Sequence, residues 1–377
     1  MNLNFAAALA TLGRDAAFRI ANAARPAAAY LLADILPEEL RSSYQVDAGG
    51  MTIRATMAGL VGMDSPYPPT GHISISKFLE NTAKIANETH LPEKALRTIQ
   101  QMVATLVSNN GGALDTTQVA VQEALNFYNL IILQPQMDVS EYLRGQALAY
   151  GALNWQFNSK GLVVSYDVPA GNVLTPRTIA GGTAYHLPGS QFFADITSIR
   201  RKLRSTGVRV ILAHPDTIDA IRYNPAHNLV VVGESGGAVT FRKVVSATGQ
   251  FSVDQADIVT LVGYGLEGEV INPANPAATL VMPFLPRGKL IGIGNNGERG
   301  YRPGLGSQNN PALVNPNRIG YTHIAPTTES GGRPGRWGEI FVPQNAPWSL
   351  AGRAASNQLP VIEQPDLLVI GTTEMAP

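Results

Sequence analysis

The segment Gly233-Glu234-Ser235-Gly236-Gly237 carries the clearest chemical pattern in this sequence. It directly follows the apolar run 229–232 and matches the G-x-S-x-G pattern, in which a serine nucleophile sits on a sharp turn. Asp257 and His323 follow in the order serine, acid, histidine that α/β hydrolases use. An α/β-hydrolase-type esterase using Ser235 is therefore an alternative function for the chain.

The residues after Ser235 favour a different structure. A nucleophile elbow needs a helix directly after the serine, whereas residues 238–241 and 244–245 are typical of strands. The His-Gly-Gly-type loop that would complete an oxyanion hole is also missing upstream of the motif. We therefore predict a β-hairpin with a Gly-Ser turn here, and no catalytic residue.

Gly292-Ile293-Gly294-Asn295-Asn296-Gly297 matches the dinucleotide-binding fingerprint and follows a predicted strand. That site requires a helix whose first turn faces the pyrophosphate. Residues 298–310 are too rich in glycine and proline to form one. We predict no bound cofactor.

Metal-binding and anion-binding patterns are weak. The sequence has no cysteine, and its histidines show no metal-ligand spacing with carboxylates, so we predict no metal site. The histidines are His72, His90, His186, His214, His227 and His323. Arg200, Arg201, Lys202 and Arg204 lie on one predicted helix, where they form either a solvated face or a contact for phosphate or an acidic partner.

The composition is typical of a subunit that assembles with other copies rather than of a basic nucleic-acid binder. The 377 residues are enough for two or three packed regions, since single cores stop growing near about 250–300 residues. Charged residues make up only 15%, and 28 basic residues balance 28 acidic ones, which argues against a basic nucleic-acid binder. No apolar run reaches the roughly 20 residues of a membrane span, and the Ala-rich start lacks the preceding basic residues of an export signal.

An extended hairpin is predicted after the first 43 residues, which indicate short helices broken at Arg25-Pro26. Apolar and polar residues alternate from Met51 and again around Ile73 and Ile75, on either side of a turn-rich tip at 62–71. An isolated hairpin is marginally stable, so we expect another surface, such as a neighbouring subunit, to cover it.

Helices and strands follow in a mixed order. We predict a helix near 96–106 and a long helix over about 115–153 that is kinked or broken at Pro135, with Asp138 and Glu141 capping its second half. Strands are expected near 162–168, 208–213, 229–232, 259–262, 280–282, 290–293, 340–342 and 367–370, and helices at 193–203 and after Pro215. Residues 294–336 are rich in glycine, proline and asparagine and indicate one long irregular connection.

This order of elements resembles the major capsid proteins of tailed bacteriophages, in particular the lambda-like major head protein family with its Hong Kong 97-type fold. Local segments are similar too: Ala194-Asp195-Ile196, Arg204 to Val208, His214-Pro215-Asp216, Pro286 to Ile291, Trp337 to Ile340, Asn345-Ala346-Pro347, Leu359-Pro360-Val361 and Pro365-Asp366. The similarity extends over nearly the whole chain.

The resemblance implies an α+β fold with a particular division of the chain. Residues 1–43 would form an N-terminal arm and 44–79 an extended β-hairpin loop. Residues 80–188 would form a peripheral β domain with a long spine helix at about 115–153, 189–294 an axial α/β domain, and 295–377 a return to the peripheral domain. The loop has no lysine before Lys77, so the covalent crosslinking of some relatives is not expected.

The implied function is structural. The resemblance predicts a non-enzymatic major capsid protein that assembles with itself into hexamers and pentamers of an icosahedral phage head around double-stranded DNA. Portal, scaffolding and decoration proteins are the further partners it implies, with assembly in the host cytoplasm, a final place in the virion and no membrane contact. An encapsulin-like compartment shell protein is a second alternative, because it uses the same fold.

Overall fold

The structure is a computed structural model of the full chain. It describes residues 21–22, 30–54, 72–91, 93–94, 97–98, 101, 105, 122, 125–126, 128–157, 160–174, 184–187, 189–203, 207–244, 258–271, 279–295, 319–341 and 350–373. The predicted break at Arg25-Pro26, the hairpin tip at 62–71, residues 115–121 of the predicted long helix, and Asp257 lie outside these ranges.

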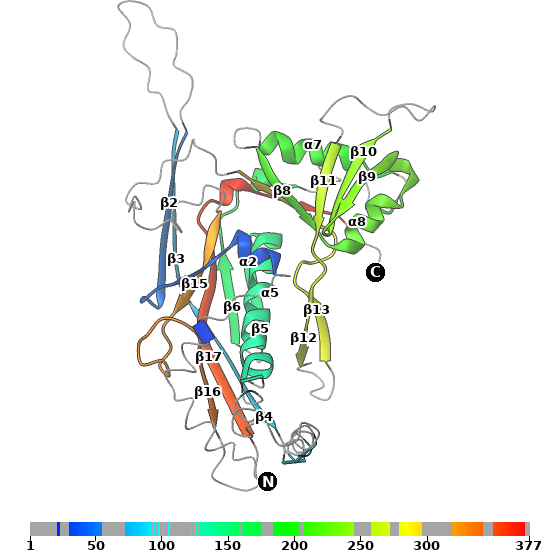
Figure 1. Cartoon of the computed structure of the whole chain (residues 1–377). Coiled ribbons are helices and arrows are strands. Elements are labelled where there is room, and N and C mark those ends of the chain that lie inside the picture. Colours follow the sequence, from blue (N-terminus) through cyan, green and yellow to red (C-terminus); the bar gives the residue numbers. More distant parts are fainter. Residues whose placement is uncertain are drawn as a thin grey trace, which may run out of the picture.

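Helix α5 (Gln134–Tyr150) stands beside the large sheets and organises the lower body in Figure 1. A π-helical turn, η1 (Tyr128–Leu133), precedes it, and Pro135 lies in its first turn, so the predicted interruption at this proline is confirmed. Proline is tolerated there because a first-turn N–H has no partner within the helix. The helix ends at Gly151, whose φ of 62° is a left-handed conformation that suits glycine.

A five-stranded sheet packs against α5 and is centred on the long strand β17 (Leu350–Ile362). Strand β4 (Ala83–Leu91) runs antiparallel along one edge of β17, and β15 (Gly320–Ala325) and β16 (Trp337–Phe341) run antiparallel along the other. The short strand β1 (Glu38–Leu40) adds to β15 in parallel. This sheet joins three segments that are far apart in sequence.

A seven-stranded sheet forms the second body, at the upper right of Figure 1. Its strands, in spatial order, are β7 (Val173–Leu174), β18 (Leu368–Thr372), β14 (Lys289–Gly294), β8 (Val208–Ala213), β11 (Ile258–Gly263), β10 (Ala238–Lys243) and β9 (Leu229–Ser235). Helices α7 (Phe192–Lys202) and α8 (Pro215–Arg222) cover one face. Because side chains alternate along a strand, Ile211 and Ala213 of β8 pack under these helices while Leu212 joins the core around α5.

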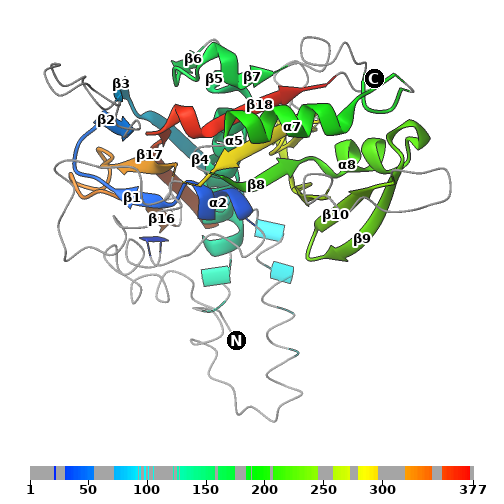
Figure 2. The ribbon, with the colours of Figure 1, turned by 90° about the horizontal axis from the view of Figure 1, so that it is seen from above.

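Three two-stranded ribbons complete the described part of the chain. Strands β2 (Gln45–Arg54) and β3 (His72–Asn81) pair from Gln45 opposite Asn81 to Arg54 opposite His72, which confirms the predicted hairpin. The other ribbons are β5 (Ala152–Phe157) with β6 (Lys160–Ser165), and β12 (Glu267–Ile271) with β13 (Thr279–Pro283). Seen from above, the β2–β3 hairpin and the seven-stranded sheet lie on opposite sides of the molecule (Figure 2).

The interpretation of residues 294–336 as one irregular connection is wrong for β15, which is buried along its whole length. Its sequence, GYTHIA, lacks a strong apolar pattern. Its polar side chains can nevertheless be buried, because they bind partners that are remote in sequence. Thr322 Oγ1, for example, accepts a hydrogen bond of 2.8 Å from Nε of Arg144 on α5. Such a partner is invisible to a local pattern.

No helix among the residues described here is long and apolar enough to cross a membrane.

Candidate assembly interface

Ser235 lies at the end of a β-hairpin, as predicted, and not at a strand-to-helix junction. Strand β9 runs antiparallel to β10, with Ser235 opposite Ala238 across the turn. Gly236 and Gly237 form that turn with φ of 57° and 78°, a conformation that glycine adopts without strain.

The histidine of the sequence-derived triad lies elsewhere. His323 belongs to β15 in the five-stranded sheet, and its Nε2 is 2.8 Å from the carbonyl oxygen of Ser43. Ser235 belongs to the other sheet. The structure therefore places this serine and this histidine in different sheets.

The first glycine of the fingerprint at 292–297 has a packing explanation. Gly292 lies within β14, under α7, where a Cβ atom would come within 2.4 Å of Ile199 Cγ2. The absence of a side chain lets the helix approach the sheet. Residues 296–297 lie outside the described ranges.

Two of the candidate histidines have local structural roles. Nδ1 of His214 accepts a hydrogen bond of 3.1 Å from the backbone N–H of Asp216 and so caps the start of α8. Buried His227 contacts Ser190 Oγ through Nε2 and the carbonyl oxygen of Ile221 through Nδ1. Within the described ranges, no three His, Cys, Asp or Glu side chains are grouped as metal ligands.

The β2–β3 hairpin is a long two-stranded ribbon. Its ten-residue strands pair with each other, and no third strand joins them among the described residues. It continues through Thr82 into β4, so its base is fixed to the five-stranded sheet. A two-stranded ribbon in water has little independent stability, and a second surface would stabilise it.

Large apolar side chains are exposed on several of these thin elements and on the strand β9 at the edge of the seven-stranded sheet. Val163 of β6 is 69% exposed, and Val281 of β13 is 56% exposed. The other exposed large apolar residues in the described part of the chain are Leu40, Tyr44, Leu130, Tyr150, Val173, Leu187, Tyr223, Val230, Val232 and Leu280. Single exposed apolar residues are ordinary, but Val163, Leu280 and Val281 lie on two-stranded ribbons and Val230 and Val232 on the edge strand β9, where exposed strand edges favour pairing with another chain.

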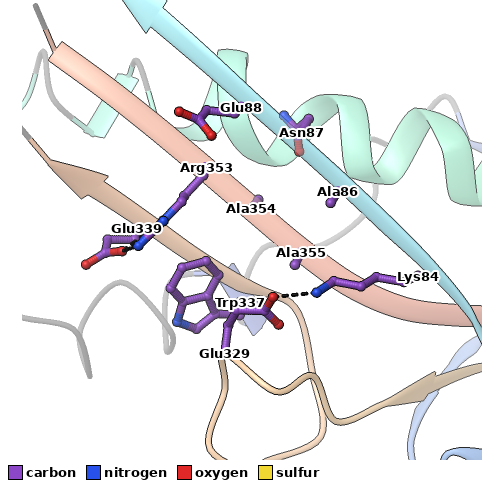
Figure 3. A pocket seen from close by; sticks show the side chains of 10 residues that line it. All are labelled: Lys84, Ala86, Asn87, Glu88, Glu329, Trp337, Glu339, Arg353, Ala354 and Ala355. Atoms are coloured by element: carbon purple, nitrogen blue, oxygen red, sulfur yellow. Dashed lines mark hydrogen bonds and ion pairs between the residues drawn. The ribbon is translucent and has the colours of Figure 1, made fainter. Parts of the chain in front are cut away.

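A shallow groove crosses the face of the five-stranded sheet that points away from α5 (Figure 3). Its volume is about 530 Å³, and Ala86 and Ala355 are among its lining residues. Lys84 pairs with Glu329, and Arg353 Nη2 is 2.7 Å from Glu339 Oε2, so these four charges are already matched within the chain. The remaining lining residues are Asn87, Glu88, Trp337 and Ala354. None of the described residues that line the groove is a serine, threonine, cysteine or histidine.

A buried ionic network holds the segment before the hairpin. The backbone N–H of Leu32, in helix α2 (Leu31–Ile35), donates to Glu141 Oε1 at 2.9 Å. Arg144 and Arg336 both reach Glu38 of β1. Burial alone would raise the pKa of Glu38, but the charges of Arg336 and Arg144 and their hydrogen bonds outweigh it and hold this pKa below its usual value.

Asp138 and Glu141 were predicted to cap a helix, and that prediction is wrong, because both lie inside α5. Glu141 is fully buried and receives hydrogen bonds from Tyr264 Oη at 2.6 Å and from Arg144 Nη1 at 2.9 Å. Tyr264 directly follows β11, so Glu141 connects the seven-stranded sheet with the segment that enters the hairpin. The sequence signal was a Glu and an Arg three residues apart on a helix flanked by apolar side chains.

Comparisons with known proteins identify the fold. No family model and no curated protein matches the sequence. A protein assigned as the capsid protein of a prophage in Escherichia coli CFT073 has a similar structure, with a TM-score of 0.52 and 9% identity over 91% of this chain and 93% of that one. The chain therefore has the mixed α+β fold of that capsid protein.

Two further structures are less similar. A phage-related protein from Bordetella bronchiseptica RB50 has a TM-score of 0.47 and 10% identity over 94% of this chain and 95% of that one. The SrpI encapsulin complex of Synechococcus elongatus PCC 7942 has a TM-score of 0.42 and 9% identity over 97% of this chain and 99% of that one.

Proposed function

We propose that the chain is the major capsid protein of a tailed bacteriophage. Copies of it assemble into hexamers and pentamers of an icosahedral head that encloses double-stranded DNA. The observation that carries the proposal is the β2–β3 hairpin, a ribbon of two ten-residue strands on a protein with a capsid fold. Neighbouring copies would cover that ribbon and the exposed apolar residues.

Each part of the chain then has a role. Residues 189–294, which contribute α7, α8 and the strands β8 to β11 and β14 of the seven-stranded sheet, form the axial domain around the five- and six-fold axes. The five-stranded sheet and α5 form the peripheral domain, and the arm and the hairpin lap over adjacent copies. Portal, scaffolding and decoration proteins are further partners, assembly takes place in the host cytoplasm, and the chain is not an enzyme.

Deletion of the hairpin tip, residues 62–71, tests this proposal. The variant should fold, because the residues pairing β2 with β3 are kept, but the purified protein should sediment as small species instead of shells. A matched control replaces the same ten positions with a Gly-Ser linker, which keeps the hairpin closed and removes only the side chains of the tip. Shells of normal yield from the deletion would refute the role of the hairpin.

The two alternatives give different results. If Ser235→Ala abolished a measurable esterase activity of the purified protein, the hydrolase function would replace the proposed one. An encapsulin-like compartment would form shells as well, but shells purified from the native source would then contain a cargo protein instead of double-stranded DNA.

A further inference from the structure

The β12–β13 ribbon is a second two-stranded element. At Gly268, its backbone packs closely against the rest of the protein. A Cβ atom on Gly268 would come within 2.8 Å of the ring of Phe284, a buried residue of the core around α5. Paired residues on neighbouring strands share a face, so Gly268 and its partner Met282 face the body. Both are half-buried, in agreement with that orientation.

The opposite face of the ribbon is acidic and apolar. Glu267 pairs with Pro283, and Glu269 pairs with Val281, so these four residues lie on the face away from Phe284. Glu267, Glu269 and Val281 are all exposed. Only Arg287, at 3.9 Å from Glu267, offers a nearby positive charge among the described residues. No described strand pairs with the outer edges of this ribbon.

The basic cluster at the end of α7 has the complementary charge. Arg200 already has a partner within the chain, since its guanidinium donates a hydrogen bond to the carbonyl oxygen of Ile258. Arg201 and Lys202 are exposed, and no ion pair joins either of them to another described residue. A helix C-terminus favours cations but leaves their charge available to a partner.

The two surfaces cannot pair within one chain. Figure 1 shows α7 along the top of the seven-stranded sheet and the ribbon hanging below it. Two different patches that meet between identical subunits make a head-to-tail contact, which forms a ring when the rotation from one copy to the next closes. The chain carries 28 basic and 28 acidic residues, so a second copy brings charges of both signs to a contact. A second copy therefore offers the charge that the ribbon lacks.

We propose that the acidic face of the β12–β13 ribbon docks on the basic end of α7 in an adjacent copy and that Val281 is buried in this contact. The inference rests on the proposed function and names one interface of the assembly. A like-charge pair at an interface opposes association strongly, and a swapped pair restores attraction.

Charge reversal in the full-length protein tests the inference. One variant carries Glu267→Lys and Glu269→Lys, a second carries Arg201→Glu and Lys202→Glu, and a third carries all four substitutions. Asp219→Lys is the control, because Asp219 is an equally exposed acidic residue on α8, outside the proposed contact. Thermal melting of each variant verifies that these surface changes leave the fold intact.

The readout is the fraction of protein in assembled particles, measured by sedimentation beside the unaltered chain. Each double reversal should lower this fraction about tenfold, and the fourfold variant should recover most of it. The inference is overturned if the double reversals assemble as the unaltered chain does, or if the fourfold variant assembles no better than they do. If the unaltered chain assembles, either of these results contradicts only the proposed contact and not the proposed function. If the unaltered chain does not assemble, the proposed function and the proposed contact are both contradicted.

A covalent test is independent of charge. The chain has no cysteine, so Glu269→Cys with Arg201→Cys introduces the only two thiols. Oxidation of the assembled double variant should give cross-linked species larger than dimers on a non-reducing gel, because a head-to-tail contact links each copy to two others. Each single variant should lack these species. Assembled protein in which the double variant stays monomeric on the gel would contradict the contact.

Discussion

Nη2 of Arg144, in the middle of α5, lies 2.9 Å from Oε1 of Glu38, in the first strand of the five-stranded sheet. The guanidinium is almost fully buried, with 1% of the side chain exposed, and Arg336 contacts the same oxygen. A buried ion pair is no guarantee of stability by comparison with apolar residues, but loss of one partner leaves an uncompensated buried charge. This network therefore fixes the segment that leads into the hairpin.

Glu38→Gln should destabilise the folded protein. The substitution keeps the shape of the side chain but leaves Arg144 and Arg336 without their shared carboxylate, so we expect the free energy of unfolding to fall by roughly 2–4 kcal/mol. Chemical denaturation at neutral pH measures the change. The control is Glu39→Gln in the same strand: Glu39 pairs with the more exposed Arg41, and its loss should cost below about 1 kcal/mol. Equal losses in the two variants would contradict the role of the network.

Acid should weaken the same attachment. The pKa of Glu38 is held below its usual value of 4.5, so its ion pairs contribute their full stability above pH 4.5 and lose it as the pH falls through the depressed pKa. Hydrogen exchange of the β1 amides between pH 5 and 3 monitors the release, and the pH range follows from the usual value. If Glu38→Gln shows the same acid-induced loss of protection as the unaltered chain, another group is responsible.

Asp195 should have the opposite pH dependence. Burial raises the pKa of Asp195 to about 6, even though the hydrogen bond from Tyr185 Oη, at 2.8 Å, lowers it. A raised acid pKa means that the folded state prefers the protonated form, so this site becomes less stabilising as the pH rises from about 4 through about 6. Asp195→Asn should therefore be more stable than the unaltered chain at pH 7, by up to about 3 kcal/mol, with the difference shrinking at acidic pH.

Denaturation curves at several pH values measure this difference. Asp219→Asn, an exposed position on α8, is the control and should leave the profile unchanged. A constant difference between Asp195→Asn and the unaltered chain from pH 4 to 7 would disprove the role of Asp195.

Gly292→Ala should loosen the packing of α7 on the seven-stranded sheet. The added Cβ would collide with Ile199 Cγ2, and overpacking of this kind costs about 1–3 kcal/mol. Gly233→Ala is the matched control, because that Cβ would meet no atom within 4 Å. Thermal unfolding separates the two variants. An unchanged melting temperature for Gly292→Ala would mean that the glycine is not needed for packing.

The sequence predicted the elements that carry strong local signals. Residues 51–56 and 72–76 alternate around a turn-rich segment, which suffices to predict a hairpin. The structure adds the register and extends the pairing to Gln45 opposite Asn81. Helix α8 begins at Pro215, where the sequence predicted a helix, and ends at Arg222. In these cases the partner or the boundary lies close by in the sequence.

Elements with remote partners were missed. Strand β17 contains Ser356 and Gln358, polar residues that look exposed in the sequence but are buried against Gln136 and Ser140 of α5. The ionic network around Glu38 joins residues up to 298 positions apart. No local periodicity encodes such pairs, because each side chain is satisfied only after the sheets and α5 have packed together.

Electron microscopy of the purified full-length protein tests the central claim most directly. The account predicts closed shells, or rings and tubes built from the same subunit contacts, because the hairpin and the β12–β13 ribbon gain a covering surface only from other copies. A monodisperse monomer at high concentration, with the β2–β3 hairpin folded against its own body, would contradict it.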